Sequence, residues 1–193
     1  MTATLSAALE QLCVDQLGPG VVSDLRKLSG GASMESWRFT FQQRDLILRL
    51  RPRGLQEDPS DTEVALVSLQ GQADLIRLLH ERAISVPGVL AKLPPQHPLG
   101  DGFVMECVAG EALPGRILRK PEFAQAREGL SVQCAEQLAA IHSVPTEALS
   151  GDLVVKTPDV LLEEQFQYYQ QFGSPNPVFE LAFAWLRAGC PTP

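Results

Sequence analysis

Three short segments rich in β-forming residues follow one another near the start of the chain, and their spacing is the strongest constraint on the fold. They span residues 21–28, 36–42 and 45–50, and are separated by Gly30-Gly31 and by the polar pair Gln42-Gln43. Connections this short join neighbouring antiparallel strands, because a parallel connection needs a dozen residues or more. The sequence therefore predicts a three-stranded antiparallel meander.

Two helices and two more strands are expected in the rest of the first half. Apolar residues recur at steps of three and four over 5–17 and 62–82, which predicts helices, with a possible break of the second at Gly71. Segments 86–93 and 102–108 are rich in strand-forming residues and are joined by a proline-rich turn. The first half is therefore expected to be a five-stranded sheet with a helix after the third strand.

The second half of the chain changes to helical periodicity beyond Gly110. Three helices are expected, over residues 121–142, 160–172 and 178–188. Both tryptophans, Trp37 and Trp185, lie in apolar periodic segments, and we expect them in the core or between lobes. The sequence thus predicts a mixed α+β half followed by an all-helical half.

Composition argues against several classes of partner. The net charge of -7 and the scattered positions of the basic residues argue against nucleic-acid binding. No run of eighteen apolar residues occurs, so a membrane-spanning helix is not expected. The four cysteines lie far apart without a C-x-x-C pair, which favours reduced thiols in a cytoplasmic protein.

A turn of small residues, Ser29 to Ser33, lies between the first two expected strands. Backbone N–H groups in such a turn can approach a phosphate without obstruction from side chains. A plain glycine hairpin is the alternative, and the turn alone does not decide between them. It is not a Walker loop, because no Lys-Ser or Lys-Thr follows and the next element is a strand.

The third expected strand carries Arg49 and Arg51 on alternate positions, so both side chains share one face. A cation on this face, beneath a glycine turn, would offset phosphate charge. An edge strand whose arginines face solvent is the alternative.

Five segments in order resemble the aminoglycoside phosphotransferase (APH) family, in the branch related to the kinase-like domain of acyl-CoA dehydrogenase fusions. They are residues 28–39, 46–51, 86–90, 103–111 and 138–142. The resemblance implies a protein-kinase-like α+β fold that begins with an N-lobe of five antiparallel strands. It divides the chain into an N-terminal helix (1–20), the N-lobe (21–105), a hinge (106–111) and part of a helical C-lobe (112–193).

The same resemblance implies an ATP site. The residues it assigns to the phosphates, the adenine and the strand-three cation are Ser29, Gly30, Gly31, Ala32, Ser33, Arg49, Met105, Glu106 and Val108. Two partners for Arg49 stay open: spacing back from Pro87 indicates Gln72, whereas Glu63 lies one helix earlier. The expected cofactors are ATP and magnesium, with the magnesium ligands beyond this chain.

The implied function is transfer of a phosphoryl group from ATP to a hydroxyl of a small molecule. No His-x-Asp pattern of the expected catalytic loop follows any of the three histidines, so we expect an N-terminal, nucleotide-binding part that is inactive alone, without catalytic or metal residues of its own. The alternatives are a non-catalytic kinase-like binding or scaffold module, and an unrelated α+β domain. A truncated C-lobe would expose apolar side chains around Phe179, Phe183 and Leu186, which predicts self-association or disorder at the C-terminus.

Overall fold

The computed structural model describes residues 2–28, 34–52, 68–149 and 156–191. The chain forms two compact units, residues 1–153 and 154–193, and each is described by itself.

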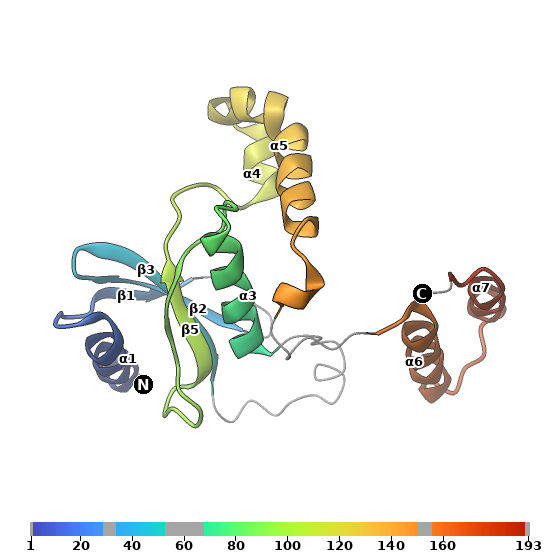
Figure 1. Cartoon of the computed structure of the whole chain (residues 1–193), viewed down its shortest axis with the longest axis horizontal. Helices are drawn as coiled ribbons and strands as arrows, with labels where there is room; N and C mark the ends of the chain where they lie inside the picture. The colour runs from blue at the N-terminus through green and yellow to red at the C-terminus, as the bar shows by residue number, and fades with distance from the viewer. Residues whose placement is uncertain (1, 29–33, 53–67, 150–155, 192–193) are drawn as a thin grey trace. The chain divides into compact units, whose positions relative to one another are not determined.

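The first unit contains a five-stranded antiparallel sheet in the order β1-β2-β3-β5-β4 (Figure 1). The strands are β1 (Ser23–Lys27), β2 (Glu35–Phe41), β3 (Arg44–Pro52), β4 (Val89–Lys92) and β5 (Gly100–Glu106). The expected sheet and its opening meander are confirmed. Because β3 pairs with both β2 and β5, the alternative in which its arginines lie on an edge strand is wrong.

Six α-helices are described. They are α1 (Thr2–Leu17), α3 (Leu69–Glu81), α4 (Pro114–Arg119) and α5 (Ala124–His142) in the first unit, and α6 (Pro158–Gln171) and α7 (Pro177–Ala188) in the second. Gly71 does not break α3, because it lies in the first turn and its N–H is capped by the Ser68 side chain. The sequence did not predict α4, since six residues without a buried side chain leave no periodic pattern.

One face of the sheet packs against α1. Alternation along β3 directs Leu46, Leu48 and Leu50 to this face, where they join Leu9 and Cys13 of α1 in the larger hydrophobic cluster. All five side chains are almost completely buried. Burial in this cluster raises the pKa of the Cys13 thiol to about 11, with a smaller contribution from Glu10.

The opposite face of the sheet packs against α3, so that α1 and α3 lie on opposite sides of β5 (Figure 1). Phe103 of β5 and Val89 of β4 contact Leu69 and Ala73 of α3 in a second hydrophobic cluster. This is the face to which β3 directs Ile47 and Arg49, because they alternate with the leucines.

The β2–β3 hairpin turns at two glutamines that both have left-handed backbone angles. Gln42 has φ 50° and Gln43 has φ 61°. Residues other than Gly, Asn and Asp seldom adopt this backbone conformation, so tertiary contacts must offset its strain. The Gln42 side-chain amide supplies them by donating to the carbonyls of Leu17 (3.2 Å) and Pro19 (3.0 Å).

Edge strand β4 is held from both sides of the sheet. The Gln16 side chain on α1 donates to the Lys92 carbonyl (2.7 Å) and accepts from the Lys92 N–H (3.1 Å). On the other side, the Lys92 ammonium forms an ion pair with Asp74 of α3 at 2.7 Å. These contacts satisfy backbone groups that an edge strand otherwise exposes.

The second unit is a hairpin of α6 and α7 joined by aromatic contacts. Phe166 and Tyr169 of α6 pack edge-on against Phe183 and Phe179 of α7, with ring centroids 5.1 and 5.7 Å apart. Trp185 is 73% exposed within this unit, so the expected core position is wrong, whereas the expected position between lobes stays a prediction. A two-helix hairpin buries only one stripe of each helix, and Trp185 lies outside that stripe.

Candidate functional site

A pocket of about 610 Å³ opens where β5 leaves the sheet. It is lined by Leu28, Ile47, Ser85, Val86, Pro87, Met105, Glu106, Cys107 and Val108. The three residues that the sequence assigned to an adenine-binding hinge, Met105, Glu106 and Val108, therefore lie together at one cavity.

Strand register explains the apolar wall of this pocket. Ile47 on β3 is the register partner of Met105 on β5, so their side chains stand next to each other on the α3 face. Met105 also packs against the cluster beneath α3. Two adjacent strands thus present a flat apolar surface of the kind that a planar ring can cover.

The backbone of Glu106 is hydrogen-bonded on one side only. Its N–H donates to the Gly88 carbonyl (2.9 Å), but the Gly88 N–H donates to the Glu106 carboxylate Oε2 (3.0 Å) instead of to its peptide oxygen. Toward β3, the bond from the Cys107 N–H to the Asp45 carbonyl (3.1 Å) makes Leu46–Glu106 the non-hydrogen-bonded pair. The peptide oxygen of Glu106 is therefore left open by the described backbone.

Val108 supplies a second open backbone group. No hydrogen bond among the described residues uses its N–H, and the residue is 70% exposed. An open carbonyl and an open N–H two residues apart can bind the edge of a planar ligand that carries one donor and one acceptor.

The carboxylate of Glu106 fixes the start of the hinge. It accepts from the Gly88 N–H and forms an ion pair with Arg44 at 3.1 Å. Its contacts anchor β5 to the segment before β4 and to the start of β3. We therefore assign the Glu106 side chain a positioning role, while its peptide oxygen faces outward.

Arg49 lies on the pocket's face of the sheet, two residues along β3 from Ile47. Its guanidinium lies over the ring of Phe103, 5.8 Å from the centroid. No ion pair between described residues involves Arg49. Of the two partners considered, Glu63 is outside the described residues and Gln72 lies on α3, so the partner stays undecided.

The predicted phosphate turn, Ser29 to Ser33, lies outside the described residues. Among the described residues that flank it, the Leu28 N–H donates to the Ser36 carbonyl at 2.8 Å. Leu28, the last described residue before this segment, lines the pocket.

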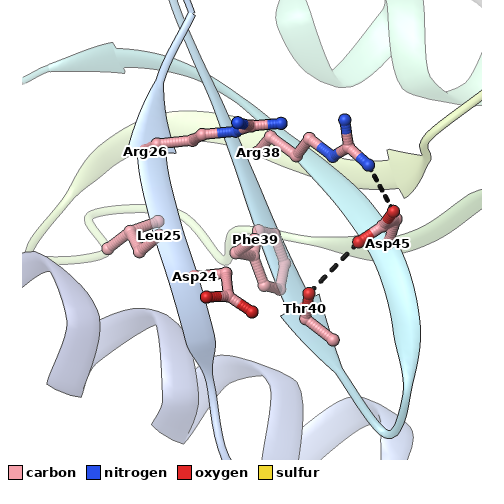
Figure 2. Close-up of a pocket in the computed structure, with 7 residues that line it drawn as sticks. All are labelled: Asp24, Leu25, Arg26, Arg38, Phe39, Thr40 and Asp45. Atoms are coloured by element: carbon pink, nitrogen blue, oxygen red, sulfur yellow. Dashed lines mark hydrogen bonds and ion pairs between the residues drawn. The ribbon is translucent and has the colours of Figure 1, made fainter.

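A second pocket of about 460 Å³ lies over β1 and β2 (Figure 2). Its lining consists of Asp24, Leu25, Arg26, Arg38, Phe39, Thr40 and Asp45. Arg38 forms an ion pair with Asp45, and this hydrogen bond, followed by that from Thr40, lowers the pKa of the Asp45 carboxyl. Arg38 and Asp45 were not among the site residues predicted from the sequence, although alternation along β2 places Arg38 on the same face as Ser36 and Thr40.

Metal ligands were not expected in this chain. Within the described ranges, no group of three His, Cys, Asp or Glu side chains is arranged to hold a metal ion. The four cysteines are free thiols. None of the helices that the structure describes has the length and apolar character needed to cross a membrane.

Comparisons with known proteins agree with the fold. The profile of the phosphotransferase enzyme family (APH) matches residues 24–191, which is most of the chain. A crystal structure from Ralstonia eutropha JMP134, assigned to the aminoglycoside phosphotransferases, aligns with a TM-score of 0.69 and 19% identity, over 93% of this chain and 52% of that one. The chain thus spans about half the length of that protein. No match was found among curated proteins. On the profile match, the chain belongs to the phosphotransferase enzyme family.

Proposed function

We propose that this chain supplies the nucleotide-binding part of an ATP-dependent phosphotransferase acting on a hydroxyl of a small molecule. The observation that carries the proposal is the pocket at the end of β5, with the open peptide oxygen of Glu106 and the open N–H of Val108 at its rim. The adenine edge carries an amino donor next to a ring nitrogen acceptor, which matches this pair of backbone groups.

The position of Arg49 supports the proposal. A nucleotide whose base contacts Glu106 and Val108 directs its phosphates away from the hinge, along the face that carries Ile47 and then Arg49. A guanidinium can bind phosphate oxygens through two parallel hydrogen bonds. The family resemblance assigns the turn at Ser29 to Ser33 to the phosphates, so we propose its backbone N–H groups as a second contact.

Calorimetric titration with Mg-ATP tests the proposal. We expect saturable binding to the wild-type chain and a loss of affinity of about tenfold to a hundredfold in Arg49→Ala, because a charge-assisted hydrogen bond to phosphate contributes about 1.5–3 kcal/mol. Arg119→Ala, which removes an arginine from exposed helix α4, is the matched control and should bind like the wild type.

One result would contradict the proposal, and another would exclude only its assignment of Arg49. A folded wild-type chain that does not bind Mg-ATP at millimolar concentration would favour the alternative, a kinase-like binding or scaffold module. Equal affinity in Arg49→Ala and wild type would separate Arg49 from the phosphates while leaving the hinge contacts in place.

The remaining parts of the proposal extend the family assignment. We propose the lobe division at 21–105, 106–111 and 112–193, a cytoplasmic location, and a small-molecule acceptor rather than a nucleic acid or a membrane. Magnesium would accompany ATP. The described residues form no cluster that could hold the metal ion.

We also propose self-association through the second unit. Among its exposed apolar side chains, Phe179 is 52% and Leu186 44% exposed, whereas Phe183 is partly covered by Phe166. Sedimentation velocity should show a concentration-dependent dimer or larger species, and Leu186→Ser should shift it toward monomer. A strictly monomeric wild-type chain at 100-fold different loading concentrations would contradict this.

A further inference from the structure

Arg38, which lines the second pocket, is paired across two strands with a residue that lines the hinge pocket at the end of β5. Arg38 on β2 is the register partner of Ile47 on β3, and Ile47 lines the hinge pocket. Directly opposed residues of an antiparallel pair have their Cβ atoms about 5 Å apart on the same face. The Arg38 side chain therefore leaves the sheet immediately beside the apolar surface of the hinge pocket, although it lines the neighbouring one.

Asp45 directs the Arg38 guanidinium toward the hinge. The guanidinium Nη2 pairs with Oδ2 of Asp45, whose Oδ1 accepts from the Thr40 hydroxyl at 3.1 Å, as Figure 2 shows. The peptide oxygen of Asp45 accepts from the N–H of Cys107, a hinge residue. Asp45, followed by the nearby Cys107 thiol, raises the pKa of Arg38.

We propose that the Arg38 guanidinium stacks on the purine base of a nucleotide bound in the hinge pocket, with Asp45 as the residue that positions it. The proposal rests on the function proposed above and assigns a base-recognition residue to that site. A base whose edge reaches Glu106 and Val108 lies against Ile47 and Arg38, since both side chains rise from one face of adjacent strands. A planar, delocalised guanidinium packs well on an aromatic ring, and this one is 35% exposed and open to a ligand.

The surroundings of Arg38 argue against a phosphate contact there. Asp45 already neutralises the guanidinium, and the two other charged residues of the same pocket, Asp24 and Arg26, offset each other. A pocket without net positive charge attracts a phosphate only weakly. Arg49, in contrast, has no acidic partner among the described residues and lies one step farther from the hinge along β3. The two arginines therefore contact different parts of the nucleotide: Arg38 contacts the base and Arg49 contacts the phosphates.

Competition for a fluorescent ATP analogue separates these two roles. The competitors are Mg-ATP, adenosine and inorganic tripolyphosphate. We expect Arg38→Leu to weaken Mg-ATP and adenosine by about five- to tenfold and to leave tripolyphosphate within twofold of wild type. Arg49→Ala should weaken Mg-ATP and tripolyphosphate and leave adenosine unchanged.

Three further variants test whether the effect on adenosine binding is specific to the Arg38 guanidinium. Arg38→Lys keeps the positive charge but replaces the planar guanidinium with an ammonium, so it should lose most of the affinity for adenosine. Because the charge is kept, this variant should remain folded even if Arg38→Leu does not. Asp45→Asn should weaken adenosine two- to threefold by releasing Arg38. Arg26→Leu, the matched control, removes the arginine opposite Arg38 on β1 and should change none of the three affinities.

The outcomes distinguish a failure of the stacking role of Arg38 from a failure of the proposed nucleotide binding. A wild-type chain that displaces the analogue with Mg-ATP, together with Arg38 variants that bind adenosine within twofold of wild type, would overturn the stacking role alone. An equal loss for adenosine and tripolyphosphate in Arg38→Leu would also overturn it, since it would indicate a charge effect. A wild-type chain that binds no nucleotide would remove both proposals.

Discussion

Replacing Phe103 with alanine is expected to lower the free energy of unfolding by about 3–5 kcal/mol. The ring is fully buried on the α3 face of β5, where it contacts Leu69, Ala73 and Val89. This cluster is the main attachment of α3 to the sheet, and it has few other members to close over the cavity. Urea unfolding monitored by circular dichroism measures the change.

Phe103→Leu is the control for this prediction. Leucine fills most of the space, so the loss should stay below about 1.5 kcal/mol. Phe103 also supports the Arg49 guanidinium, which lies 5.8 Å above its ring. A loss of stability below about 1 kcal/mol in the alanine variant would show that α3 does not depend on this cluster.

The second large effect is expected for Gly102→Ala. A Cβ atom at Gly102 would lie 2.2 Å from the peptide oxygen of Arg49 and 3.2 Å from the Cα of Leu50. Both atoms belong to the backbone of β3, so no side-chain rotation can relieve the contact. Strands β3 and β5 would have to separate in the centre of the sheet, and we expect a loss of about 3 kcal/mol in the free energy of unfolding.

The same substitution elsewhere should have the opposite sign. In helix α5, a Cβ at Gly129 would meet only the flexible end of the Gln133 side chain, at 3.3 Å. Gly129→Ala should therefore stabilise the helix by about 0.5–1 kcal/mol. Thermal unfolding of both variants is the measurement. Similar melting temperatures for Gly102→Ala and wild type would mean that the two strands can shift without cost.

Local patterns predicted most of the fold correctly. Short polar connections between β-rich segments predicted the antiparallel meander, and alternation along β3 predicted that Arg49 shares a face with Arg51. These features depend on residues close in sequence, whose conformational limits act within each segment. The short helix α4 was not predicted, because it buries no side chain and therefore shows no apolar periodicity. Apolar periodicity predicted Trp185 in the core or between lobes, and the structure excludes only the core of its own unit, where Trp185 is exposed.

The candidate site was predictable only in part. The sequence by itself determined the strands, the small-residue turn and the arginine on β3, and a family resemblance indicated the hinge at Met105, Glu106 and Val108. Only the tertiary structure placed β3 in the centre of the sheet and diverted the Gly88 N–H to the Glu106 carboxylate. The physical reason is that these features depend on the register between strands distant in sequence, which is set by packing on α1 and α3 and not by any local pattern.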